Sequence, residues 1–198
     1  MNLTRRRFMT GITLLASAPL WPSLREAPAA SVATPGRWPG YAEAIVIDAL
    51  GGPGEYNAEP LAPLSAKALD DVRASGLTAV NLTVSGVGSY AKDADETIRN
   101  IAYWNAQIAA HPEHLLQVRS AADLAMAKQS GRLGLVYGFQ DATPLGEDLE
   151  RVALYDDLGV RVFQLTYNRR NLIGDGCLEP GNAGLSALGR TLVERLNE

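Results

Sequence analysis

Short apolar runs alternate with longer segments of helical spacing along most of the chain. The runs are rich in Ile, Val and Leu, which is typical of buried strands, and each is followed by a segment long enough for a helix. This order predicts an α/β fold with a parallel sheet and right-handed crossovers. The predicted strands are 44–50, 78–84, 115–118, 133–139 and 160–166, and we expect the first of them to be buried.

Capping residues mark the predicted helix boundaries. Ser65 is placed to cap a helix that Gly76 stops in the left-handed conformation. Ser120 and Asp123 have the spacing of a capping box at the start of another helix, which ends at Gly131. The predicted helices are 65–75, 95–110, 120–131, 148–158 and 185–196.

The beginning of the chain differs in kind from the rest. Three arginines and a phenylalanine at residues 5–8 precede an apolar run at residues 11–20, and small residues follow at 27–29. This pattern predicts a Tat-type signal peptide over residues 1–30, export to the periplasm, and a folded domain over residues 31–198. The alternative is an uncleaved membrane anchor, which is disfavoured because a spanning helix needs ~20 apolar residues.

Charge and cysteine content exclude some partners. Removal of residues 1–30 takes away four arginines and one glutamate, which changes the formal net charge from −4 to −7. An acidic chain disfavours nucleic acid, or an anionic membrane surface after signal cleavage, as a partner. The single cysteine, Cys177, lies far in sequence from His111 and His114, so we expect a loop or core thiol rather than a nucleophile. The two histidines are expected in a solvated turn rather than in a surface metal site.

The pattern alone leaves two architectures open: a five-stranded doubly wound sheet, or the first part of an eight-stranded barrel. Length favours the first, because a TIM barrel typically takes ~250 residues. In a barrel, the chemistry lies just after the strands. The informative segments are therefore 48–54, 84–88, 140–143 and 167–171.

Residues 134–190 contain two stretches, GVRVFQLTYNRRNLIGDG and GLSALGR, whose spacing resembles the membrane dipeptidase (renal dipeptidase) family of zinc peptidases. Those enzymes are TIM barrels, so the resemblance implies a TIM-barrel-type α/β fold with about the first five βα units of a metallo-dependent hydrolase barrel. The family continues into further strands, so we expect a truncated product or a fragment. An open barrel edge would permit self-association.

The resemblance also implies where the family's functional residues fall. A His-x-Asp metal pair at the end of the first strand falls on Leu50 and Gly52, a bridging glutamate on Gln140, and a substrate-contacting histidine on Tyr167. Zinc is thus implied by the family, whereas these residues of the chain provide no metal ligand.

Two functions stay open. One is an exported dipeptidase-like protein that hydrolyses dipeptides with metal-bound water, impaired or altered here, with Gln140 and Tyr167 at the catalytic positions. The other is a catalytically inactive periplasmic binding protein for a peptide or a small modified amino acid. In both, Tyr167, Asn168 and Arg169 are the residues that we expect to bind a carboxylate-bearing ligand.

Overall fold

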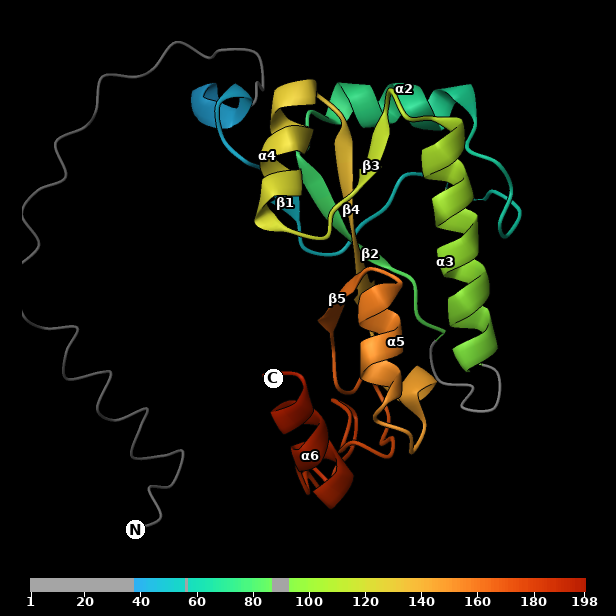
Figure 1. Ribbon diagram of the computed structural model, residues 1–198, viewed down its shortest axis with the longest axis vertical. Helices are drawn as coiled ribbons and strands as arrows, with labels where there is room; N and C mark the ends of the chain where they lie inside the picture. The colour runs from blue at the N-terminus through green and yellow to red at the C-terminus, as the bar shows by residue number, and fades with distance from the viewer. Residues whose placement is uncertain (1–37, 56, 87–92) are drawn as a thin grey trace, which may run out of the picture. The chain divides into compact units, whose positions relative to one another are not determined.

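The computed structural model describes residues 38–198 except 56 and 87–92 (Figure 1). The predicted signal peptide lies outside these residues. The elements are η1 (Pro39–Ala42), β1 (Ile47–Asp48), α2 (Ala66–Ser75), β2 (Ala79–Thr83), α3 (Asp93–Ala110), β3 (Leu115–Gln117), α4 (Ala121–Ser130), β4 (Leu133–Phe139), η2 (Thr143–Leu145), α5 (Arg151–Asp157), β5 (Val160–Phe163) and α6 (Ala187–Arg195).

β4 is the central strand of a parallel sheet. β2 pairs with residues 134–138 of β4, and β1 pairs with β2. β3 pairs with residues 133–135 of β4, and β5 with residues 137–139. Because a strand has two edges and β2 occupies one, β3 and β5 follow each other along the other edge. The path β1–β2–β4–β5 keeps the order of the sequence, as in a barrel, and β3 is a short extra strand.

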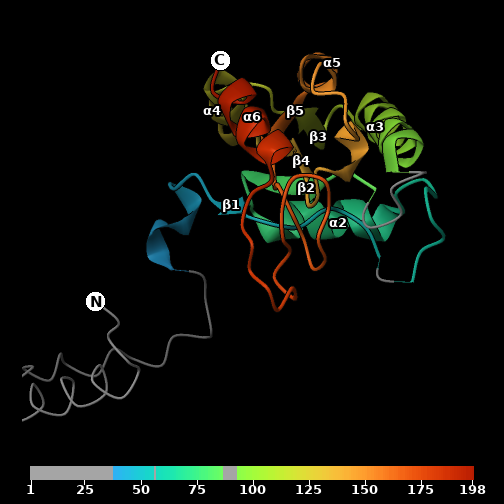
Figure 2. The same cartoon turned by 90° about the horizontal axis from the view of Figure 1, so that it is seen from below.

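Different helices cover the two faces of the sheet. Alternate residues of β4 from 133 to 139 face a core that includes Ile101 of α3 and Tyr155 of α5. Val136 belongs to a second cluster with Ala127 of α4. Accordingly, α3 and α4 lie on opposite sides of the sheet (Figures 1 and 2). The chain runs from β3 back to β4, against the direction of the other crossovers, so a right-handed connection places α4 on the opposite face.

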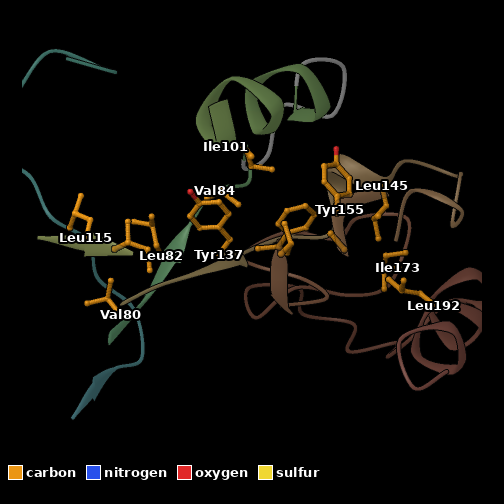
Figure 3. Close-up of a cluster of buried hydrophobic side chains, with 14 of the residues drawn as sticks. Val80, Leu82, Val84, Ile101, Leu115, Tyr137, Leu145, Tyr155, Ile173 and Leu192 are labelled. Atoms are coloured by element: carbon orange, nitrogen blue, oxygen red, sulfur yellow. The ribbon is translucent and has the colours of Figure 1, made fainter. Parts of the chain in front are cut away.

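The main core follows the sheet to its carboxyl end (Figure 3). Phe139 makes edge-to-face contacts with Tyr155 and Phe163, at ring-centroid distances of 4.8 and 4.9 Å. Beyond these rings, Ile173 and Leu192 extend the same core to α6. Full burial of a large apolar side chain contributes about 1.5–3 kcal/mol, so these two residues hold the last part of the described chain against the sheet.

The predicted helix boundaries agree with the structure to within a few residues. Ser65 caps α2, and Gly76 ends it with φ 64°. The capping box of Ser120 and Asp123 is present at the start of α4, and Gly131 ends that helix with φ 67°. The prediction of an α/β fold with a parallel sheet is likewise confirmed.

Two strand predictions need correction. β1 has two residues, and Ile45 and Ile47 are 53% and 48% exposed, so the prediction of a buried first strand is wrong. Within the described residues β1 pairs with β2 alone, which leaves its side chains with few neighbours. The fifth strand ends at Phe163, earlier than predicted. The partner strand, β4, ends at Phe139, whose carbonyl accepts a hydrogen bond from the Gln164 N–H (3.0 Å). Beyond this bond β4 provides no residue with which β5 could pair.

We expect Gly189→Ala to destabilise the fold. A Cβ at Gly189 of α6 would lie 2.0 Å from the backbone carbonyl oxygen of Ile173, so the helix would have to move. Alanine improves helix propensity by about 1 kcal/mol, whereas overpacking costs about 1–3 kcal/mol or more. Urea denaturation should therefore show a lower free energy of unfolding for Gly189→Ala. Gly181→Ala is the matched control, because nothing lies within 4 Å of its Cβ. An equal effect in both variants would contradict the packing argument.

Candidate functional site

A buried carboxylate joins the segments that follow β4 and β5. Asp141 is 4% exposed and accepts hydrogen bonds from the Thr143 N–H (2.9 Å) and from Nδ2 of Asn171 (2.8 Å). Oδ1 of Asn171 in turn accepts from the N–H groups of Ile173 (2.8 Å) and Gly174 (3.1 Å). Asn171 therefore fixes the loop after β5 to the end of β4.

A second buried carboxylate ties α3 to the same region. Asp93 is fully buried, and its Oδ2 accepts from the Thr143 hydroxyl at 2.5 Å. One turn later, the Thr97 hydroxyl donates to the Asp93 carbonyl (2.6 Å) and accepts from the Gly86 N–H (3.0 Å), which follows β2. Both acids at this end of the sheet are thus bonded within the fold, as buried polar groups generally are.

Gln140 stands directly after β4 and is half-buried. Its N–H donates to the hydroxyl of Ser85 (3.1 Å), which follows β2, so the ends of the two strands are held together. No hydrogen bond joins the side-chain amide of Gln140 to another described residue.

Tyr167, Asn168 and Arg169 lie in the loop after β5 and are held there through their backbone. The carbonyls of Tyr167 and Asn168 accept from the N–H groups of Cys177 (2.8 Å) and Leu178 (2.9 Å). The Asn168 side chain accepts from the Cys177 thiol (3.3 Å). Tyr167 is 38% exposed and Arg169 is also exposed, so both side chains face solvent.

The neighbouring Arg170 is engaged in the same loop. Its Nε lies 2.6 Å from Oδ1 of Asp175, and its N–H donates to Glu179 (2.7 Å). The hydrogen bond from Arg170 lowers the pKa of the Asp175 carboxyl below its ordinary value, and the Ala183 N–H acts in the same direction. The structure thus links Gln140 to the Tyr167–Asn171 segment indirectly, through the adjacent pair Asp141 and Asn171.

The two first-strand positions lie in the loop after β1. Leu50 is 54% exposed, and its N–H donates to Asp48 (3.0 Å). A Cβ at Gly52 would lie 2.7 Å from Cδ1 of Leu82, so an aspartate at this position would have to displace that side chain. In the described part of the chain, no three His, Cys, Asp or Glu side chains come together as a metal site.

The two histidines lie at the other end of the sheet, before β3. The N–H of His114 donates to the carbonyl of His111 (3.0 Å), which forms the predicted turn between α3 and β3. Nε2 of His114 lies 3.3 Å from the Glu113 carboxylate. These groups are therefore at the start of the strands, whereas Gln140 and Tyr167 follow strand ends.

Sequence reasoning pointed to the segments that contain Asp141, Thr143 and Asn171 without assigning roles to them. The signal was their position directly after predicted strands. Asp93 was missed, because the helix that contains it was predicted over residues 95–110. The predicted signal peptide and its alternative as a membrane anchor lie outside the described residues, and none of the described helices is long and apolar enough to cross a bilayer.

We expect Asn171→Ala to lower the free energy of unfolding by about 2–3 kcal/mol. The substitution leaves the buried Asp141 carboxylate without one donor and removes the acceptor of two N–H groups; an unsatisfied buried group costs about 1–3 kcal/mol. Asn197→Ala, at an exposed asparagine, is the control and should stay within about 0.5 kcal/mol of the parent. Equal urea midpoints for the two variants would refute the role of Asn171.

Comparison with solved structures gives the fold. An amidohydrolase from Pseudomonas aeruginosa is 34% identical, with a TM-score of 0.66, and the match covers 79% of this chain and 44% of that one. The probable dipeptidase PvdM from the same organism is 22% identical (TM-score 0.63; 79% and 45% covered). A dipeptidase AC of metallopeptidase family M19 is 16% identical (TM-score 0.62; 77% and 53% covered).

The chain therefore has the α/β fold of the TIM-barrel type and spans about half the length of these structures. No curated protein sequence matches it. The sequence profile of the membrane dipeptidases, peptidase family M19, matches residues 64–198, which is more than half of the chain. The chain belongs to the membrane dipeptidase family.

Proposed function

We propose that this protein is an exported dipeptidase-like protein that binds a dipeptide at the carboxyl end of the sheet and in which hydrolysis is impaired or altered. The membership in the dipeptidase family supports a dipeptide as the ligand. The observation that carries the proposal is that some polar side chains after the strands are buried and hydrogen-bonded, whereas others are exposed. Asp141 and Asp93 are buried and bonded within the fold, whereas Tyr167 and Arg169 are exposed.

These groups suit a ligand with a carboxylate and an amide. The Arg169 guanidinium has the charge and the paired donors that a carboxylate accepts, and the Tyr167 hydroxyl adds one donor. The amide of Gln140 offers both a donor and an acceptor to a peptide group. Binding of a dipeptide through these side chains requires no metal ion.

Zinc is the group that the family implies. The described residues do not form a site for it: Leu50 and Gly52 have no ligating side chain, and no three ligand-type side chains converge. We therefore derive no hydrolytic step through zinc for these residues. This is the basis for proposing that hydrolysis is impaired or altered.

A catalytically inactive periplasmic binding protein is the second candidate. The observation that favours it is the exposure of Tyr167 and Arg169 in a loop that Arg170 and Asp175 hold in place. Such a protein would bind a peptide or a small modified amino acid without turnover. The two candidates share the ligand site and differ in whether any hydrolysis occurs.

Binding of L-alanyl-L-alanine to the full chain tests the shared site. Isothermal titration should show saturable binding that weakens about tenfold in Arg169→Gln and in Tyr167→Phe, because hydrogen bonds to a charged group contribute about 1.5–3 kcal/mol and these lie near solvent. Arg99→Gln, at an exposed arginine of α3, is the matched control. The C-terminal amide of the dipeptide should bind the parent and both site variants with similar weak affinity. Unchanged affinity of the acid in both variants would overturn the site.

The exposed thiol of Cys177 gives an independent readout, because it donates to Asn168 at 3.3 Å. Dipeptide bound at Asn168 should slow its reaction with a maleimide. An unchanged labelling rate at saturating dipeptide would place the ligand elsewhere.

We expect Gln140→Glu to increase the zinc bound per chain, because a carboxylate binds a divalent cation more strongly than a neutral amide does. Gln164→Glu is the matched control on the segment after β5. Zinc content is measured by mass spectrometry after dialysis, and hydrolysis of L-alanyl-L-alanine by amine release. Turnover in the parent that a chelator abolishes would favour the dipeptidase, and binding without turnover would favour the inactive protein. Equal zinc content and hydrolysis in parent and Gln140→Glu would contradict the idea of a weakened metal position.

A further inference from the structure

A pocket of about 260 Å³ lies between the loop after β1 and the side of α3. Its walls come from residues 53–55, 58–59 and 61–65 of the loop, the start of α2, the end of β2 and the middle of α3. Neither Gln140 nor the segment after β5 contributes to it. The residues that define its chemistry are Glu55, Glu59, Thr83, Asn100, Tyr103 and Trp104.

Two hydrogen bonds join the loop to α3, and a third lies within the loop. The Tyr103 hydroxyl donates to the Ala62 carbonyl at 2.7 Å, and the Leu64 N–H donates to the side chain of the buried Gln107 at 2.9 Å. The Ser65 hydroxyl donates to one oxygen of Glu55 at 3.0 Å. The two bonds to α3 join residues that are 41 and 43 positions apart in sequence, so they hold the loop against the helix before any ligand binds.

The lining is acidic and aromatic. Glu55 and Glu59 are exposed, and the described lining contains no lysine or arginine. The nearby Lys67 lies 2.5 Å from Asp71, which neutralises its charge more directly than Glu55 does. The rings of Tyr103 and Trp104 meet edge to face at 5.0 Å. The pocket therefore combines negative charge at the loop with ring surfaces on the helix.

We propose that this pocket binds a small organic ammonium ion. A cation is attracted both by the carboxylates and by the negative face of an indole or phenol ring. The net charge of −4 favours the approach of a cation from solution. The apolar part of the ligand would pack against Leu61, Leu64 and Ala68, which also line the pocket. This inference goes beyond the proposed function and does not depend on it.

Benzylammonium is the probe, and benzyl alcohol, which has the same ring without the charge, is its neutral counterpart. Trp104 is the only tryptophan left when Trp21 and Trp38 are replaced by phenylalanine, so its fluorescence reports on the pocket in the full chain. We expect saturable quenching by benzylammonium, at least fivefold weaker binding of benzyl alcohol, and weaker benzylammonium binding in high salt.

Substitutions in the loop test whether the carboxylates of Glu55 and Glu59 attract the ammonium group. Glu55→Gln and Glu59→Gln should each weaken benzylammonium binding about threefold to fivefold, as expected for partly exposed ion pairs. Glu43→Gln, an exposed glutamate outside the pocket, should leave the affinity unchanged. Tyr167→Phe should also leave it unchanged, which separates this pocket from the proposed dipeptide site. Equal binding of benzyl alcohol and benzylammonium, or unchanged affinity in both pocket variants, would overturn the proposal.

Discussion

The pairing of β4 along both of its edges is the interaction on which the described structure depends. β2 occupies one edge, while β3 and β5 share the other, so every strand of the sheet is positioned by β4 directly or through β2. Its side chains alternate between the two hydrophobic clusters, one covered by α3 and α5 and the other by α4. A strand buried on both edges and both faces tolerates little change, which is why the polar residues that could meet a ligand come only after it ends.

The same constraint explains why the carboxyl end of the sheet holds buried acids. The chain leaves β4 at Gln140 and turns at once, so its next polar groups lie under the loop that follows β5. Asp141 and Asp93 are satisfied there by Asn171 and by Thr143. Breaking such a hydrogen bond leaves an unpaired carboxylate in a low-dielectric environment, which costs free energy. The hydrogen bonds of these acids therefore hold the segments together. A ligand at this end of the sheet would therefore contact side chains on segments that these hydrogen bonds hold in position.

Local and non-local interactions account for what the sequence could predict. The ends of α2 and α4 were predictable because Ser65, Gly76, Ser120 and Asp123 act through bonds to residues only a few positions away. The exposure of β1 was not predictable, because the burial of a strand depends on which strands and helices lie beside it. The strand-end segments were predictable as places for chemistry. The bond between Asp141 and Asn171, which are 30 positions apart, was not, since it depends on how β4 and β5 pair.

The family relationship and the site geometry answer different questions. The fold and the matched residues 64–198 establish membership in the membrane dipeptidase family, and membership by itself does not fix the chemistry of a site. A metal-dependent peptidase needs several ligands that converge on one point, which is a collective property that the loss of one or two residues destroys. Recognition of a dipeptide needs only a few donors and acceptors near a strand end, and these survive separate substitutions. We therefore propose binding rather than hydrolysis for the described residues, because Gln140, Tyr167 and Arg169 provide donors and acceptors after strands, whereas Leu50 and Gly52 provide no metal ligand.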